Sequence, residues 1–313
     1  MNNNIKLSII IINYKTPVLT LQCISSIYEF CDLKETEIIF VDNNSQDNSV
    51  ELIKENFPEV KMYENEGNEG FGRANNKGFS VSSGKYILLL NSDILLTSAE
   101  TIPKCINILE SDVKIGALGC KLINEDGSHQ NSVNYYTTEY SGILRKNLFI
   151  DKLYKFSQKT KIKALMGAFF LIPRKVFEET NGFDPDFFMY CEEIEFCDRI
   201  IKKGYSLFYY DEVSVIHKNE GSSTDSKWVI RQKNLSSYLF LWKQKGIFHY
   251  YINISFNIFN TITNFCLMLF LDKNYRKDFF YSTYNFYSTF ARYLLIPFRY
   301  SRKTGNGRKM LKY

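Results

Sequence analysis

The stretch YILLLNSDILLTS, residues 86–98, interrupts an apolar run with Asn91-Ser92-Asp93. The run has the length and character of a buried strand, so Asp93 is expected at the carboxyl end of a strand. An unpaired carboxylate is costly to bury there, which predicts a cationic partner. A divalent metal is such a partner, because Mg²⁺ is commonly held by a carboxylate and substrate phosphates. A turn former or a helix N-cap is the alternative interpretation.

The residues before this stretch alternate between short β-branched runs and longer helical patterns, which is typical of a parallel sheet covered by helices. The predicted strands are residues 7–12, 37–41, 60–66 and 86–98, and the predicted helices are about residues 16–30, 49–56 and the stretch that begins in the glycine-rich string at 70–84. Polar residues follow each strand at its carboxyl end, where open α/β sheets bind ligands. The expected class is α/β.

From about residue 117 the pattern becomes a mixture of strands and helices. Residues 164–184 predict a strand, a helix and a turn, and residues 191–205 predict a helix that ends at Gly204. A last strand, residues 206–218, closes the globular part.

Composition excludes several classes of protein. The net charge of +5 is small and dispersed through the first two thirds of the chain, so nucleic acid is not an expected partner. The seven cysteines include no C-x-x-C pair, which indicates neither a disulfide framework nor a zinc site and fits a reducing cytosol. The apolar run at residues 7–12 is too short to span a membrane and lacks a signal-peptide cleavage pattern.

The end of the chain has a different character. Residues 246–271 contain no Lys, Arg, Asp or Glu and are long enough to span a bilayer. Asparagines at 253, 257, 260 and 264 lie along one helical face, however, which favours a helix in the membrane interface or packed on a partner. A basic segment follows, with Arg299, Arg302, Lys303, Arg308, Lys309 and Lys312. A helical appendage that packs on the rest of the chain, or forms a dimer, is the alternative.

Two strings before residue 86 offer ligand-binding groups. Gly70 and Gly72 allow close approach of the backbone to a ligand, and Arg73 can pair with a phosphate. Asn75 and Asn76 are expected at the start of a helix. In VDNNS, Asp42 ends its strand and can accept hydrogen bonds from a nucleobase or ribose, or form an Asx-turn.

Two further groups lie near the end of the globular part. Glu192, Glu193 and Glu195 cluster at a helix start, where acidic side chains also simply complement the helix dipole. His217 directly follows a strand, which makes it a candidate metal ligand, with a surface or core histidine as the alternative.

In this order, these pieces resemble the inverting family 2 glycosyltransferases of the GT-A fold. The strings that carry the resemblance are GFGRANN (70–76), LLLNSD (88–93), MGAFFLIPR (166–174), GFDPDFFMYCEE (182–193) and IH followed by GSS (216–223). They look most like bacterial rhamnosyltransferase-type members that build surface polysaccharides. The resemblance covers residues 5 to about 245 and implies a GT-A fold, a Rossmann-like and mostly parallel sheet flanked by helices, with a helical C-terminal appendage beyond it.

The resemblance implies a role for each matching residue. Asp93 matches the last carboxylate of the family's D-x-D motif, and His217 matches a histidine that completes the site for Mg²⁺ or Mn²⁺. Asn91 stands where the first aspartate of that motif is often found. Glu193 matches the general base, which is usually Asp. The donor site is expected to contain Asn13, Tyr14, Asp42, Asn44, Gly70, Arg73, Asn75, Asn91 and Asp93.

The implied reaction moves a sugar from a nucleoside diphosphate to a growing surface polysaccharide or lipid-linked glycan. dTDP-rhamnose is the preferred donor, with a UDP-hexose or UDP-N-acetylhexosamine as the alternative. The predicted domains are a glycosyltransferase domain at 1–245 and a tail at 246–313; the former has a nucleotide-binding half at 1–116 and an acceptor and catalytic half at 117–245. The tail is expected to contact the inner face of the cell membrane or a second copy of the chain, which makes the protein cytoplasmic and peripheral.

Two rival functions make different demands on the sequence. A nucleotidyltransferase is expected to carry its glycine-rich loop right after the first strand, where NYKTP stands instead. A non-catalytic scaffold that binds sugar nucleotides has no need for a base and a metal site. The joint presence of Asp93, the glutamate pair and His217 argues against it.

Overall fold

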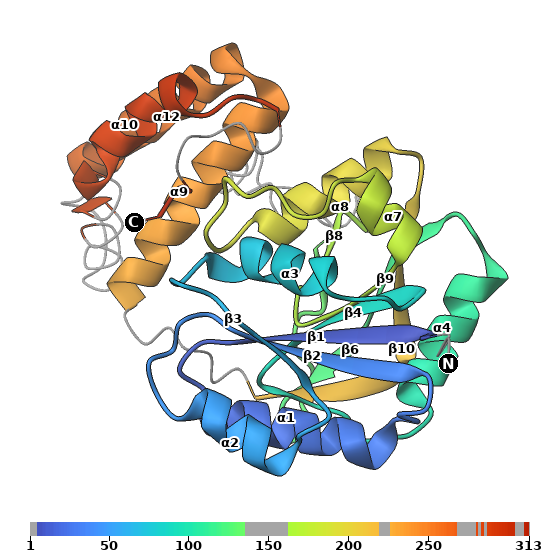
Figure 1. The fold of residues 1–313 in the computed structure, drawn as a ribbon. Helices are drawn as coiled ribbons and strands as arrows, with labels where there is room; N and C mark the ends of the chain where they lie inside the picture. Colours follow the sequence, from blue (N-terminus) through green and yellow to red (C-terminus); the bar gives the residue numbers. More distant parts are fainter. Residues whose placement is uncertain are drawn as a thin grey trace. The chain divides into compact units, whose positions relative to one another are not determined.

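The computed structural model describes residues 5–134, 162–218, 226–267, 280, 283–284, 287–303 and 310–312. The chain divides into two compact units (Figure 1). The first contains residues 1–137, 159–184 and 192–224, and the second contains residues 138–158, 185–191 and 225–313.

The first unit is built on an eight-stranded sheet whose first half is parallel. Strands β3 (Lys61–Glu64), β2 (Thr36–Asp42), β1 (Leu7–Asn13) and β4 (Tyr86–Asn91) lie in this order. The isoleucines of β1 are almost wholly buried, because helices cover both faces of a parallel sheet. In the register of the sheet Asn13 lies opposite Asp42, and Ile12 lies opposite Asn91. The polar ends of three strands therefore meet at one edge.

The second half of the sheet is mixed. It continues with β9 (Phe169–Pro173), β6 (Ile115–Ile123), β10 (Ser206–His217) and β5 (Ile94–Leu95); β9 is antiparallel to both of its neighbours, and β5 is antiparallel to β10. A separate short pair joins β7 (Val133–Asn134) to β8 (Ala164–Leu165).

The prediction of one strand over residues 86–98 is wrong. The chain leaves the sheet after Asn91, turns, and returns as β5 at the far edge, where Ile94 pairs with His217. The two apolar runs belong to different places in the sheet, and the polar Asn91-Ser92-Asp93 segment is the connection between them.

Helices cover the two faces of the sheet (Figure 1). Their bounds are α1 Pro17–Phe30, α2 Ser49–Asn56, α3 Gly70–Ser80, α4 Thr101–Ser111, α7 Arg174–Glu179 and α8 Glu192–Lys202. Cys23, Ile24 and Ile27 of α1 and Ile102 and Cys105 of α4 join the core formed with one face of the sheet. Proline at the first position of α1 suits a helix start, since its missing N–H has no partner there in any case.

The second unit is helical, with α9 (Ser226–Lys245), α10 (Ile247–Leu267) and α12 (Phe290–Arg299). Aromatic side chains hold these helices together. The rings of Tyr238 and Tyr293 stack at 4.4 Å between centroids, and the Tyr250 hydroxyl donates to the Tyr293 carbonyl at 2.5 Å. Helix α9 packs with α10 and α12 inside one unit. The domain boundary predicted at residue 245 stays a prediction.

The asparagine face of α10 is turned toward α9 at the positions that the structure describes. Asn253 is buried and accepts from Asn257 Nδ2, which also donates to the Tyr238 hydroxyl at 2.5 Å. The side chains of Asn260 and Asn264 lie outside the described residues. Within the parts of the chain that are described, none of the helices combines the length and the apolar character that crossing a membrane requires.

Candidate active site

A hydrogen-bond network joins the carboxyl ends of β1 and β2. Asn13 is fully buried; its Nδ2 donates to Asp42 Oδ1 at 2.8 Å and to Ser45 Oγ at 2.9 Å. Its Oδ1 accepts from the hydroxyls of Thr16 and Thr20. Asp42 also accepts from the backbone N–H of Ser45, which is the Asx-turn alternative. Both residues thus support the strand ends from within, and their contact with a donor stays a prediction.

The turns beside this network are tightly constrained. Lys15 and Asn44 have φ angles of 59° and 60°, a left-handed conformation that is uncommon for residues other than glycine. Tyr14 and Asn44 are half-buried at this edge of the sheet. The Thr16 hydroxyl reaches the Ser92 hydroxyl at 3.1 Å, so the turn after β1 is tied to the connection that carries Asp93.

The fold brings Asp93 next to His217. The pairing of β5 with β10 places His217 Nε2 3.4 Å from Asp93 Oδ1, and both side chains are nearly inaccessible. Asn91, where the motif's first aspartate is often found, is half-buried and donates its backbone N–H to the Ala168 carbonyl.

Gln130 determines which nitrogen of the imidazole carries its proton. Its Nε2 donates to the His217 backbone carbonyl at 2.6 Å, and a carbonyl can only accept, so the amide orientation is defined. The Gln130 Oε1 then accepts from His217 Nδ1 at 2.8 Å. In the neutral ring the lone pair is therefore on Nε2, facing the carboxylate of Asp93.

These residues fit a divalent cation. Two electron-pair donors that face each other repel, and a cation between them removes the repulsion. The 3.4 Å between Asp93 Oδ1 and His217 Nε2 suits one ion, since Mg²⁺ lies about 2.1 Å from its ligands. Among the described residues, no group of three or more His, Cys, Asp or Glu side chains is arranged to hold a metal ion, so the pair is the candidate.

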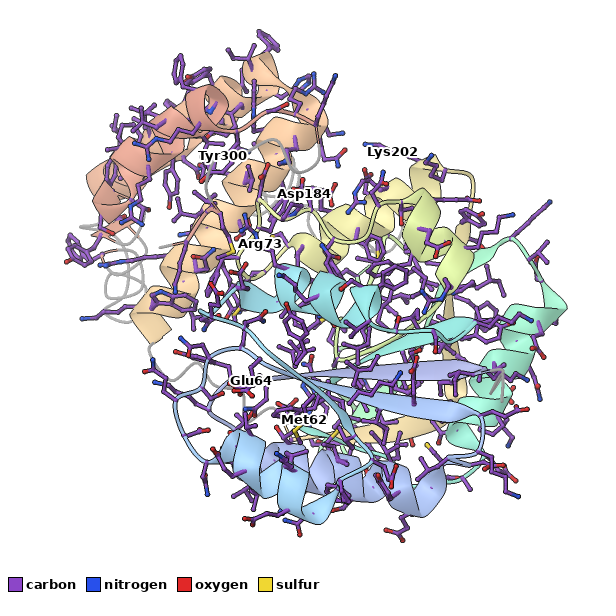
Figure 2. The ribbon with its side chains drawn as sticks, in the orientation of Figure 1. Met62, Glu64, Arg73, Asp184, Lys202 and Tyr300 are labelled. Carbon is purple, nitrogen blue, oxygen red and sulfur yellow. The ribbon has the colours of Figure 1, made fainter. Side chains whose placement is uncertain are left out.

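The glycine-rich string forms the start of α3. Gly70 has a φ of 72°, and its carbonyl accepts from Asn43 Nδ2 at 3.1 Å. Arg73 projects from α3 (Figure 2), 3.6 Å from a carboxylate oxygen of Glu69. Gly72 has a packing role, because a Cβ there would come within 3.0 Å of Phe183 Cβ.

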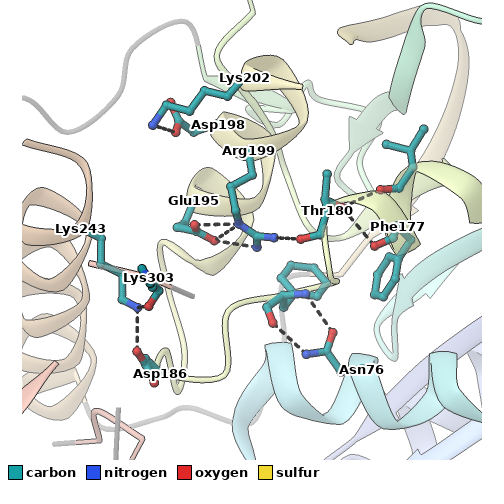
Figure 3. Close-up of polar contacts among 12 residues, drawn as sticks. Asn76, Phe177, Thr180, Asp186, Glu195, Asp198, Arg199, Lys202, Lys243 and Lys303 are labelled. Carbon is teal, nitrogen blue, oxygen red and sulfur yellow. Dashed lines mark hydrogen bonds and ion pairs between the residues drawn. The ribbon is translucent and has the colours of Figure 1, made fainter. Parts of the chain in front are cut away.

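Asn75 lies inside α3 rather than at its start, because the helix begins at Gly70. Its side chain is buried; Nδ2 donates to the Phe71 carbonyl, and Oδ1 has no hydrogen-bond partner among the described residues. Asn76 forms a two-way contact with the backbone of Phe183, donating to its carbonyl and accepting from its N–H (Figure 3). This ties α3 to the segment that precedes the acidic helix start.

The three glutamates of α8 have three different environments. Glu195 is buried and paired with Arg199 at 2.8 Å, and Arg199 also donates to the Thr180 carbonyl (Figure 3), so Glu195 is structural. Burial, and then the charge of Glu193, raise the pKa of Glu192 well above its ordinary value. Glu193 is half-buried.

Glu193 borders the segment MGAFFLIPR, residues 166–174, which contains strand β9. A Cβ placed on Gly167 would lie 3.9 Å from Glu193 Cβ and 3.4 Å from the Phe71 ring. The start of α8, Gly167 and the first turn of α3 are thus neighbours. Glu195 is paired with Arg199, and the buried Glu192 favours its proton. Glu193 is the glutamate of this group that borders Gly167.

The raised pKa of Glu192 predicts a pH dependence of stability. Above about pH 4.5, its ordinary pKa, the unfolded chain releases this proton while the folded protein retains it. The contribution of Glu192 to the free energy of unfolding therefore falls as the pH rises toward the folded pKa. We expect Glu192→Gln to lack this fall, so its melting temperature relative to wild type is higher at pH 8 than at pH 4.5. A constant difference across the range would contradict the assignment.

Several residues of the site were not found from the sequence. Ser45 lies in the string VDNNS, and its hydroxyl donates to Asp42 Oδ1 at 2.6 Å. Asn43, which donates to the Gly70 carbonyl, lies in the same string without an assigned role. Asn76 was expected at a helix start but lies inside α3, where it binds the backbone of Phe183. Gln130 has no local signal at all, because its role depends on contact with a strand far along the chain.

Comparison with known proteins gives two family matches and several relatives. Residues 8–180 match the family described as Glycosyl transferase family 2, and residues 148–219 match one described as N-terminal domain of galactosyltransferase. Rhamnosyltransferase WbbL of Escherichia coli is 28% identical over 193 residues, which cover 58% of this chain and 69% of that protein. The N-acetylglucosaminyl-diphospho-decaprenol L-rhamnosyltransferase of Mycobacterium tuberculosis is 22% identical over 66% of this chain and 75% of its own length.

The fold has a solved counterpart. The mannosyltransferase PcManGT from Pyrobaculum calidifontis, in complex with GDP-Man and Mn²⁺, superposes with a TM-score of 0.58 at 15% identity, over 92% of this chain and 87% of that one. This likeness confirms the expected GT-A fold, a mostly parallel sheet flanked by helices with further helices at the C-terminus. Because the family match spans more than half of the sequence, the chain belongs to glycosyl transferase family 2.

Proposed function

We propose that the protein is an inverting, metal-dependent glycosyltransferase that moves a sugar from a nucleoside diphosphate to a lipid-linked saccharide. The observation that carries the proposal is the pairing of Asp93 with His217, held by Gln130 at the carboxyl edge of the sheet. Asp93 and His217 would hold Mg²⁺ or Mn²⁺, which offsets the charge that develops on a leaving diphosphate.

Glu193 acts as the base in this proposal. It takes the proton of the acceptor hydroxyl while the acceptor oxygen bonds to the anomeric carbon and the bond to the diphosphate breaks on the opposite face. The environments of the neighbouring glutamates support this choice. Arg199 neutralises Glu195, and burial keeps the proton on Glu192.

The relatives support a substrate class. Two of them are named rhamnosyltransferases, and one of these acts, by its name, on an N-acetylglucosaminyl-diphospho lipid. We therefore take dTDP-rhamnose as the preferred donor, a UDP-hexose or UDP-N-acetylhexosamine as the alternative, and a polyprenyl-diphosphate-linked saccharide as the acceptor. The residues expected to contact the donor lie at the end of β2 (Asp42), on the turn after it (Asn44) and in the first turn of α3 (Gly70 and Arg73).

The proposed function is tested with a panel of donors. Each nucleotide sugar is incubated with the protein, Mn²⁺ and N-acetylglucosaminyl-diphospho-decaprenol, and released nucleoside diphosphate is measured, with the melting temperature as a second readout. The donor should raise the melting temperature and be consumed, since a ligand of the folded state stabilises it. Stabilisation without consumption of any donor would favour the non-catalytic scaffold.

We also propose that the second unit attaches the protein to the cytoplasmic leaflet. Ile247, Phe248 and Phe298 are 56%, 70% and 78% exposed. Arg302 donates to the carbonyls of Lys243 and Gln244, so basic residues lie beside the α9–α10 turn that carries two of these apolar side chains. Exposed apolar groups and basic groups give two separate attractions to an anionic membrane, each basic residue adding about 1 kcal/mol.

Binding to membranes should then be peripheral and salt-sensitive. We expect the protein to sediment with vesicles of anionic lipid at low salt and less at high salt, because salt screens the basic residues. The double variant Phe248→Ser/Phe298→Ser should bind weakly at every salt concentration. Val113→Ser is the matched control, since Val113 is 85% exposed in the first unit. Equal binding by all three proteins would contradict the attachment and favour a dimer contact.

A further inference from the structure

The segment that leads into the acidic helix start has a strained backbone. Tyr190 and Cys191, directly before Glu192, have φ angles of 68° and 65°. Residues other than glycine rarely adopt this left-handed conformation, and two in succession cost on the order of 1 kcal/mol or more each. Such a conformation persists only where surrounding contacts hold it.

Helix α9 supplies the first of these contacts. The Ser236 hydroxyl donates to the Met189 carbonyl at 2.7 Å, and the Ser237 hydroxyl lies 3.5 Å from Cys191 Sγ. Lys233 Nζ lies 4.9 Å from the centre of the Tyr190 ring, a cation–π contact. Side chains of one face of α9 therefore contact three consecutive residues of the strained segment.

The end of the chain supplies the second set. Leu311 donates its N–H to the Asp186 carbonyl at 2.8 Å and forms a parallel bridge with Phe187. Lys312 Nζ lies 4.5 Å from the centre of the Phe188 ring. These contacts add a short strand-like partner to the first half of the segment.

A buried ion pair fixes the same half. Lys243 Nζ lies 2.6 Å from Asp186 Oδ2, with the two side chains 2% and 1% exposed, and it also donates to the Lys303 carbonyl (Figure 3). A charge pair removed from water is stable only with such close geometry and further hydrogen bonds, so it selects one arrangement of the segment.

We propose that α9 and residues 310–312 form a clamp on residues 185–191, and that this clamp positions Glu193 for proton transfer. Every contact of the clamp lies within the second unit, and the peptide chain carries its effect to Glu193, two residues beyond Cys191. The second unit is then a part of the catalytic apparatus as well as an attachment to membranes. The inference rests on the proposed role of Glu193 as the base.

The test uses two mild variants of the full chain. Ser236→Ala removes the hydroxyl that holds the Met189 carbonyl and keeps a good helix former. Leu311→Pro removes the N–H that bonds to Asp186. Thr261→Val is the control for Ser236→Ala, because each removes one hydroxyl from the second unit. Among the described residues, the Thr261 hydroxyl bonds only to the carbonyl of Asn257 in its own helix.

We expect Ser236→Ala and Leu311→Pro to lower kcat by about 10- to 100-fold, the effect of a small displacement of a catalytic group, with the KM for the donor unchanged. Hydrogen exchange at residues 185–193 should become faster. In a Glu193→Gln background the two variants should cause no further loss, since the base they position is already absent. Thr261→Val should behave like wild type in all three measurements.

Normal kcat in both variants would overturn the clamp, as would a loss of the same size in the Glu193→Gln background. A raised donor KM with normal kcat would also overturn it, because that result places the effect on donor binding. If Glu193→Gln alone retains normal turnover, the proposed base is wrong, and that outcome is distinct from failure of the clamp.

Discussion

Replacing Glu193 by Gln is expected to lower turnover by roughly 10²- to 10⁴-fold, the usual range for removal of a general base. Gln has the same shape as Glu but cannot accept the proton of an acceptor hydroxyl. Donor affinity should change little, because the amide keeps the shape of the carboxylate and Glu193 is not among the predicted donor contacts. The measurement is kcat and donor KM with the panel described above.

Glu178→Gln is the matched control for this experiment. Glu178 is an exposed glutamate of α7, so its replacement changes the charge by the same amount and should leave kcat unchanged. A Glu193→Gln protein with near-normal turnover would show that Glu193 is not the base.

Replacing Asp93 by Asn is expected to weaken donor binding in the presence of Mn²⁺ by about 10- to 100-fold or more. Loss of a residue that only supports a metal ligand already has an effect of this size, and Asp93 is itself the proposed ligand. The amide is a poor ligand for a hard cation, and it removes the charge that His217 Nε2 faces. Binding of the nucleotide without metal should be nearly unchanged. Titration calorimetry of nucleoside diphosphate, with and without Mn²⁺, measures both.

The control for the metal experiment is Asp112→Asn. Asp112 is exposed at the amino end of β6, away from the carboxyl ends of β1, β2 and β4, and its carboxylate accepts only from Lys114 N–H among the contacts of the described residues. Equal loss of binding by Asp93→Asn with and without Mn²⁺ would contradict the ligand role and favour an aspartate that only forms the turn.

Local patterns were sufficient for most of the first half of the fold. The isoleucines of β1 and the leucines of β4 are buried on both faces, which is why their runs are continuous, and α2 begins and ends at the predicted residues 49 and 56. Polar residues directly after these strands were also enough to place Asn13, Asp42 and Asn91 at one edge. In a parallel sheet, strand ends that follow the same pattern meet there.

Local patterns were not sufficient where two segments with the same apolar pattern occupy different places in the fold. Residues 86–91 and 94–95 are equally apolar, yet they occupy non-adjacent places in the sheet, because β5 pairs with a strand far along the chain. The spacing of Asn253 and Asn257 predicts a polar stripe on one helical face. The hydrogen bond from Asn257 to Tyr238 is what shows that this stripe packs on a neighbouring helix.

In the candidate site, the residue types can be predicted from the sequence: a carboxylate after a strand, a histidine after another, and three glutamates at a helix start. Their different charge states and partners depend on the fold. It pairs Glu195 with Arg199, buries Glu192, and sets the proton of His217 through Gln130. Charge state and hydrogen bonding depend on neighbours in space, and the partners that fix His217 are brought to it by strand pairing rather than by sequence spacing.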